Sequence, residues 1–106
     1  MTKVRIEPGI CGFTAITGAE ATEDYTVRLR VASGCGAVQE MMKALGSAFS
    51  AFDVCRTEPG TGPFYAYAAE HFPVHASCPV IAGITKCVEA ECNLALRQDA
   101  GIFFEE

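Results

Sequence analysis

The stretch "YTVRLRVAS" (residues 25–33) carries the clearest structural signal in the chain. Apolar and polar side chains alternate along it: Tyr25, Val27, Leu29 and Val31 on one side, Thr26, Arg28 and Arg30 on the other. A period of two residues is typical of a β-strand with one buried face. We therefore predict a strand here, with the apolar set buried and the two arginines exposed.

Two further strands are predicted on the N-terminal side of this stretch. "KVRIE" (residues 3–7) alternates in the same way and ends at the turn residues Pro8 and Gly9. A weaker strand follows from residue 13 to about residue 19 and includes "FTAIT". The tail "AGIFFEE" (residues 100–106) has the composition of a last strand.

Helices are predicted for the remainder. After Cys35 the apolar residues recur every three or four positions, which predicts a helix reaching about residue 52. Pro63 and Pro79 are each suited to the first position of a further helix. The order β-β-β-α-α-α-β predicts a two-layer α+β fold, with helices on one face of a mainly antiparallel four-stranded sheet.

Length and charge limit the number of domains and the classes of partner that we expect. The chain has 106 residues, half of them hydrophobic, which predicts a single domain over residues 1–106. Its net charge is −5 and its eight Lys and Arg residues are scattered along the sequence, so we expect neither nucleic acid nor a membrane as partner. No secretory signal or long apolar run is visible, so we expect a cytoplasmic protein. A protein partner or a homo-oligomer stays open.

Six cysteines are the most informative residues. In a reducing cytosol they favour metal or thiol chemistry over disulfides. Four are expected in loops or at element ends: Cys11, Cys35, Cys55 and Cys78. In a three-stranded meander the first and third strands end at the same edge, and the third helix begins there, so Cys11, Cys35 and Cys78 should converge. We predict that they bind a metal, either zinc or an iron–sulfur cluster.

The fourth ligand is left open. Cys55 would reach this edge only if the first helix breaks at Gly46; otherwise His75 or an exogenous ligand would complete the site. Cys87 falls on the apolar stripe of the third helix, so we expect it to be buried, and we expect Cys92 to be peripheral.

Two other interpretations compete with a metal site. Cys78 precedes Pro79 at a predicted helix N-terminus, where the helix dipole favours a thiolate, so it is a candidate sulfur or thiol carrier. A structural or interaction module is the third possibility. No Ser/His/Asp arrangement and no phosphate-binding loop can be recognised, and whether the protein is an enzyme stays open.

Two resemblances bear on these alternatives. "CPVI" (residues 78–81) resembles the Cys-Pro-x-Pro motif of small sulfur-carrier proteins, with Ile81 in place of the second proline; it implies a sulfur-carrying Cys78. Over nearly its whole length the chain resembles a family of uncharacterised proteins of about a hundred residues from anaerobic archaea and bacteria. That resemblance rests on "PGICGF", the Ser-x-Cys after the third strand, and "CPV". It implies no established activity, and an anaerobic setting favours an exposed iron–sulfur site.

Overall fold

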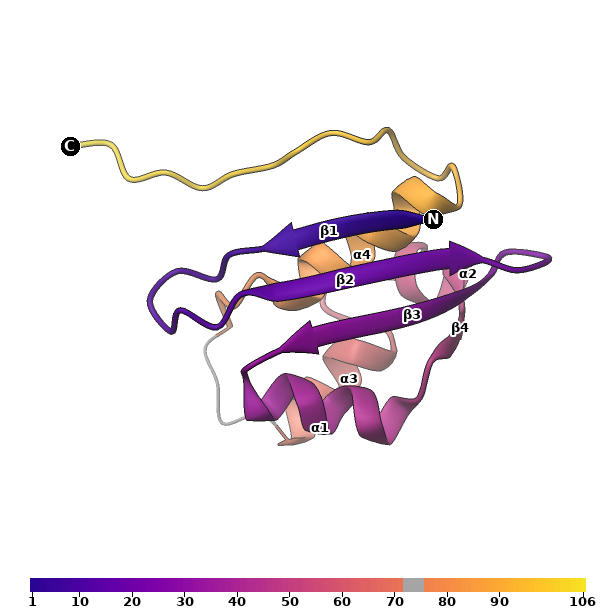
Figure 1. Ribbon diagram of the computed structural model, residues 1–106, viewed down its shortest axis with the longest axis horizontal. Coiled ribbons are helices and arrows are strands. Elements are labelled where there is room, and N and C mark those ends of the chain that lie inside the picture. Colours follow the sequence, from indigo (N-terminus) through magenta and orange to yellow (C-terminus); the bar gives the residue numbers. More distant parts are fainter. Residues whose placement is uncertain (72–75) are drawn as a thin grey trace.

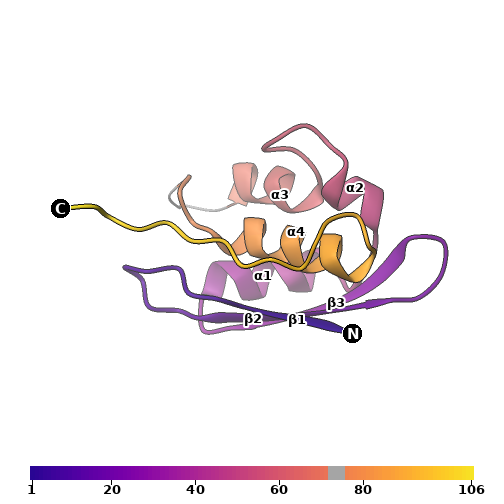
Figure 2. The ribbon, with the colours of Figure 1, turned by 90° about the horizontal axis from the view of Figure 1, so that it is seen from above.

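The structure, a computed structural model, describes residues 1–71 and 76–106. Its elements are β1 (Thr2–Ile6), β2 (Ala15–Ala21), β3 (Thr26–Ser33), α1 (Gly36–Leu45), β4 (Ala48–Ser50), α2 (Ala51–Cys55), α3 (Pro63–His71) and α4 (Val80–Glu91). The strands form one antiparallel sheet in the order β1-β2-β3-β4 (Figure 1). In Figure 2, α2, α3 and α4 lie on one side of this sheet. The predicted α+β fold is confirmed.

The core lies between α4 and the inner face of β1, β2 and β3. Alternate strand residues such as Ala15, Ala19 and Leu29 are buried there. From α4 the side chains of Val80, Ile81, Ile84, Cys87 and Val88 enter the same core. Contact is closest at Gly83, where an added Cβ would lie 2.3 Å from Cγ1 of Ile6. A glycine is therefore what lets α4 approach the end of β1.

The register predicted for β3 is confirmed at its centre. Val27 and Leu29 are buried, whereas Arg28 and Arg30 are exposed. Tyr25, which we expected in the strand and buried, is instead 49% exposed. It and Asp24 have φ values of 58° and 48° and occupy the tight turn that Thr26 closes by donating its N–H to the Glu23 carbonyl. Positive φ at both central positions is the geometry of a type I′ hairpin turn. Tyr25 therefore belongs to the turn, and β3 begins after it, at Thr26.

The long first helix expected from the sequence is interrupted. It ends at Gly46, whose φ is 84°, a conformation that favours glycine. The chain then pairs with β3 as β4, placing Phe49 opposite Val27, before α2 begins at Ala51. Thus β4, and not the C-terminal segment, supplies the fourth strand.

The predicted C-terminal strand was wrong. Residues 100–106 pair with no strand in the part of the chain that the structure describes. The chain turns back after α4 through hydrogen bonds from Leu94 and Ala95 N–H to the Glu89 carbonyl. Arg97 then donates a 3.0 Å hydrogen bond to Thr2 Oγ1. Beyond this point the tail runs in an extended form past the body (Figure 1).

The helix starts follow the two prolines closely. Pro63 is the first residue of α3, as predicted, while Pro79 is the N-cap of α4 and Val80 its first helical residue. Within residues 1–71 and 76–106, no helix has the length and apolar character needed to cross a bilayer.

Candidate functional site

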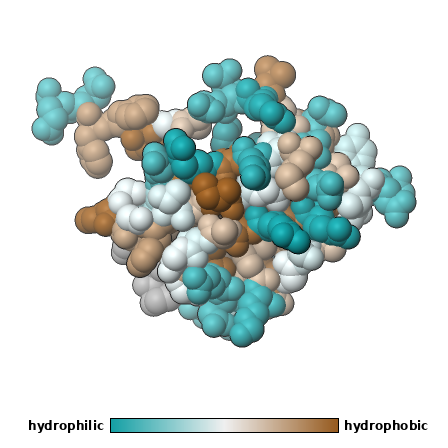
Figure 3. Space-filling view, in the orientation of Figure 1, coloured by the Kyte–Doolittle hydropathy of each residue, from teal (hydrophilic) through white to brown (hydrophobic). Residues whose placement is uncertain are grey.

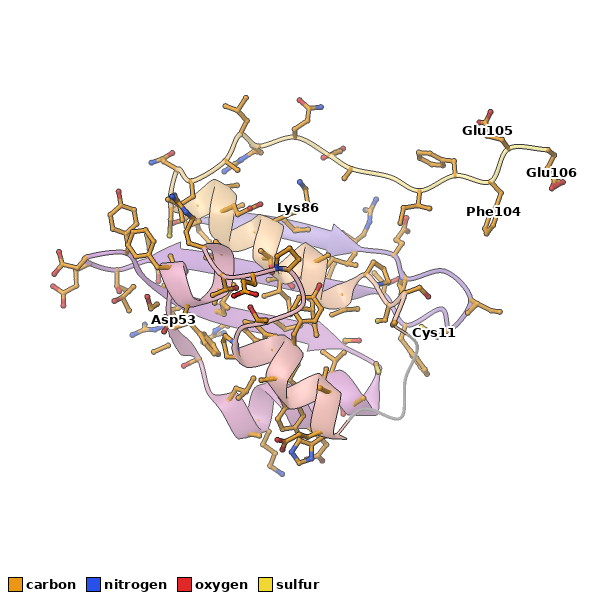
Figure 4. All side chains as sticks on the ribbon, turned by 180° about the vertical axis from the view of Figure 1, so that it is seen from behind. Cys11, Asp53, Lys86, Phe104, Glu105 and Glu106 are labelled. Carbon is orange, nitrogen blue, oxygen red and sulfur yellow. The ribbon has the colours of Figure 1, made fainter. Side chains whose placement is uncertain are left out.

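Cys11 lies at the tip of the β1–β2 hairpin. Gly12 N–H donates to the Gly9 carbonyl over 3.0 Å, so Ile10 and Cys11 are the central residues of a β-turn. The flanking glycines have φ values of 94° and 73°. Both Cys11 and its neighbour Ile10 are exposed, and Figure 4 shows Cys11 at one end of the molecule.

Cys35 is the N-cap of α1. Its N–H donates to Ser33 Oγ at 3.1 Å, and its carbonyl accepts the first helical hydrogen bond from Gln39. The side chain is partly buried against the core and makes no capping hydrogen bond. Cys35 therefore lies at the N-terminal end of α1 with its side chain against the core.

Cys78 lies one position further from its helix than Cys35 does. It directly precedes the N-cap Pro79, whose carbonyl accepts from Gly83 N–H at 2.9 Å. Like Cys35 it is partly buried against the core.

The loops that carry Cys11 and Cys35 follow β1 and β3, which end at the same end of the sheet. Ile6 and Ser33 lie on either side of Ala15, the first residue of β2. The Phe13 ring of the hairpin loop lies 3.0 Å from where a Cβ on Gly34 would be, next to Cys35. The N-terminal half of α4 contacts Ile6. We call Cys11, Cys35 and Cys78 the edge thiols.

The edge thiols do not form a ready-made ligand set. Within residues 1–71 and 76–106, no three His, Cys, Asp or Glu side chains lie close enough together to hold a metal ion. His75, the substitute ligand suggested by the sequence, lies outside the described residues.

The other three cysteines lie together with α4, and we call them the buried thiols: Cys87 and Cys92, which are buried, and Cys55, which is partly buried. The helix break at Gly46 does occur, but α2 then places Cys55 Sγ 3.7 Å from the Thr85 carbonyl, within α4. Burial raises the pKa of Cys55 to about 12, with Glu89 and Cys92 adding to the effect. Such a thiol is protonated at neutral pH and is a poor metal ligand in this state.

Cys87 and Cys92 belong to the core. Cys87 Sγ donates to the Thr2 carbonyl at 3.3 Å, and burial, reinforced by Glu91, raises its pKa to about 11. Its predicted packing role is confirmed. Cys92 was wrongly expected to be peripheral: it is only 8% exposed, and burial raises its pKa as well. It lies four residues after Val88, so the helical period that placed Cys87 inside also places Cys92 there.

A second surface was not predicted from the sequence. On the sheet face that no helix covers, which we call the outer face, Lys3, Gly18 and Arg30 lie directly opposite one another. Gly18 forms part of the floor of a hollow of about 840 Å³ between this face and α1. The basic residues are far apart in the sequence, so only strand pairing brings them together.

The chain belongs to the family of unknown function DUF6951, whose model matches residues 2–104. None of the curated proteins and none of the solved structures compared with the chain gave a match.

Proposed function

We propose that this DUF6951 protein binds a thiophilic metal, as zinc or as an iron–sulfur cluster, through its edge thiols. The observation that supports the proposal is that the loops of Cys11 and Cys35 follow strands that end at the same end of the sheet, where α4, which Cys78 precedes, contacts Ile6. The buried thiols are left out of the proposed ligand set because they lie against α4, where burial raises the pKa of each.

Two of the edge thiols lie at the N-terminal ends of helices. Cys35 is the N-cap of α1, and Cys78 directly precedes the N-cap of α4, so each lies near the positive end of a helix. Three thiolates around a dication leave one negative charge and one free coordination position. His75 stays the sequence-based candidate for that position, with an exogenous ligand as the alternative.

Binding requires the hairpin loop to close. Metal–sulfur bonds of about 2.3 Å bring sulfur atoms to within roughly 3.5 to 4 Å of one another. Cys11 is the thiol that moves in this proposal: its turn is exposed, and Ile10 beside it is 97% exposed. Closure therefore gives up little packing.

A metal titration under anaerobic conditions tests the proposal. Reduced protein is titrated with Zn²⁺, and in parallel with Co²⁺, whose thiolate complexes absorb in the near ultraviolet. We expect one ion per chain. Each of Cys11→Ser, Cys35→Ser and Cys78→Ser should weaken binding by more than roughly 100-fold, because even outer-shell partners of a metal are worth roughly 10- to 100-fold.

Cys55→Ser is the matched control, since it removes a thiol of the same chain that lies against α4. It should leave the affinity and the cobalt spectrum unchanged. Loss of binding in Cys55→Ser, or full binding in all three edge variants, would contradict the proposal. For an iron–sulfur cluster the same variants are compared after anaerobic reconstitution with iron and sulfide, by iron content and visible absorption.

A sulfur-carrier role for Cys78 is a second candidate, supported by its place immediately before the N-cap of a twelve-residue helix. On this account Cys78 acts alone. Incubation with a persulfide donor would then add one sulfur atom to Cys78, detected by mass spectrometry of its peptide. Cys11→Ser and Cys35→Ser would react as fast as the wild type, whereas metal binding requires all three edge thiols.

A further inference from the structure

The outer face of the sheet is cationic in a protein whose net charge is negative. Five of the eight Lys and Arg residues lie on or beside it: Lys3, Arg5, Arg28, Arg30 and Lys43. Within the described part of the chain, the only ion pair among them joins Arg5 Nε to Glu7 Oε1 at 3.9 Å. In Figure 3 this face shows hydrophilic side chains around an apolar patch. Two acidic residues also lie on this face: Glu7, and Glu20 directly opposite Arg28. Lys3, Arg30 and Lys43 are therefore the positive charges left to meet an acidic partner.

The centre of this face is left bare by a glycine. Gly18 lies between Lys3 and Arg30, and a Cβ added there would have nothing within 4 Å. Glycine within a strand weakens the strand, and it often marks a place where another chain approaches closely. Around it the hollow of about 840 Å³ has apolar lining from Ile16 and Met42. The site is therefore suited to an apolar segment that carries acidic groups.

The C-terminal segment of the chain has this composition. Ile102, Phe103 and Phe104 are 89%, 83% and 96% exposed, so the apolar residues contact very little of their own molecule. Two glutamates, Glu105 and Glu106, follow them. Figure 4 shows Phe104, Glu105 and Glu106 at the end of an extended tail that projects from the body.

We infer that residues 101–106 of one copy dock in the outer-face hollow of a second copy. The aromatic rings would cover Gly18 and Ile16, and the acidic end would meet Lys3 and Arg30. Large exposed apolar side chains, gathered in one segment, mark an interaction site. The opposite charges of the tail and the face give the contact its direction.

A second copy, and not the same chain, is the favoured acceptor. The hydrogen bond from Arg97 to Thr2 fixes the start of the tail beside β1. From there the tail runs along β1 and leaves the body near the β1–β2 hairpin, on the helix side of the sheet (Figures 1 and 2). Its aromatic end thus points away from its own outer face. Two copies that exchange tails give a closed two-fold dimer.

Analytical ultracentrifugation of the full chain tests this inference. We expect a dimer that weakens with added salt, because exposed charges are screened. The double variant Phe103→Ser, Phe104→Ser should dissociate at least about 100-fold more readily, given the apolar area lost. Gly18→Glu should also give a monomer, since it fills the hollow with a negative charge and meets no steric clash of its own.

Two controls and one mixing experiment complete the test. Ile10→Ser removes an equally exposed apolar side chain, and Gly36→Glu changes another unhindered glycine; both should remain dimeric. Mixing the tail variant with Gly18→Glu should restore dimers, because one intact tail then finds one intact hollow. A monomeric wild type would overturn the inference. This holds also if its tail binds its own sheet, or if a nucleic acid binds the basic face. So would a dimer unaffected by the tail variant.

Discussion

Glu91 ties the end of α4 to the beginning of the chain. Its carboxylate accepts hydrogen bonds from Ala21 N–H at 2.9 Å and from Thr2 Oγ1 at 2.7 Å, and the N-terminal ammonium lies 3.7 Å away. These groups, led by the Ala21 N–H, lower the pKa of Glu91 below the ordinary 4.5, while burial opposes them. One side chain thus links β1, β2 and α4.

Glu91→Gln should destabilise the protein by about 1 kcal/mol at pH 7, because hydrogen bonds to a charged group are the stronger ones. The folded-state pKa is lowered, so the stabilisation is complete above pH 4.5 and is lost as the pH falls through the lowered value. Urea unfolding at pH 7 and pH 3 should show a larger difference between wild type and variant at pH 7 than at pH 3. Glu70→Gln, on an exposed side chain, is the control. Equal stability of Glu91→Gln and wild type at pH 7 would contradict this role.

Single residues were predictable where the pattern around them was regular. Cys87 was correctly expected in the core because Val80 and Ile84 set the period before it. Tyr25 was not, since its alternation with Val27 hides the positive φ that the hairpin turn imposes on it. Periodicity reports which side a residue faces and gives no information on where the backbone turns.

At the scale of the elements, the three long strands followed from alternation, and the fourth did not. Ala48–Ser50 is too short to alternate, and Phe49 and Phe52 continue the spacing of the preceding helix. Gly46 was the only local sign of the break. The tail was predicted as a strand and is not one. "GIFFE" has the composition of a strand, but a strand also needs a neighbouring strand to hydrogen-bond with, and composition does not predict whether there is one.

The contact between α4 and β1 should be sensitive to a single methyl group. Gly83→Ala places a Cβ 2.3 Å from Ile6 Cγ1, so we expect destabilisation by about 1 to 3 kcal/mol from overpacking. Alanine is a better helix former than glycine, so without a steric clash the substitution should raise the stability. A loss of stability therefore indicates the clash. Thermal unfolding followed by circular dichroism measures it. Gly36→Ala in α1, where nothing lies within 4 Å, should not lower the melting temperature. An unchanged or higher melting temperature for Gly83→Ala would show that α4 packs more loosely than described.

Across the whole molecule the six cysteines divide by environment. The buried thiols lie with α4 and stay protonated, while the edge thiols lie where two helices begin and a hairpin turns. Strand order was enough to predict that Cys11 and Cys35 follow strands that end at the same end of the sheet. That Cys78 joins them stays a prediction. The distances between their sulfur atoms depend on the conformations of three loops. One of these loops contains Gly9 and Gly12, both with positive φ. No periodic pattern in the sequence encodes such loop conformations.

The outer face illustrates the same limit. From the scattered lysines and arginines we expect neither nucleic acid nor a membrane as partner, but their positions in the sequence do not show how they gather on the surface. Strand pairing brings Lys3 and Arg30 to either side of Gly18, and α1 adds Lys43. A charge pattern that is dispersed along the sequence can therefore be concentrated in space.

X-ray absorption at the zinc edge, on protein loaded with one equivalent of Zn²⁺ under anaerobic conditions, tests the central proposal most directly. It counts the sulfur atoms bound to the metal. Binding by the edge thiols predicts three sulfur ligands near 2.3 Å, and two in each of Cys11→Ser, Cys35→Ser and Cys78→Ser if zinc is still bound. A shell without sulfur, or a sulfur count that none of these substitutions changes, would contradict it.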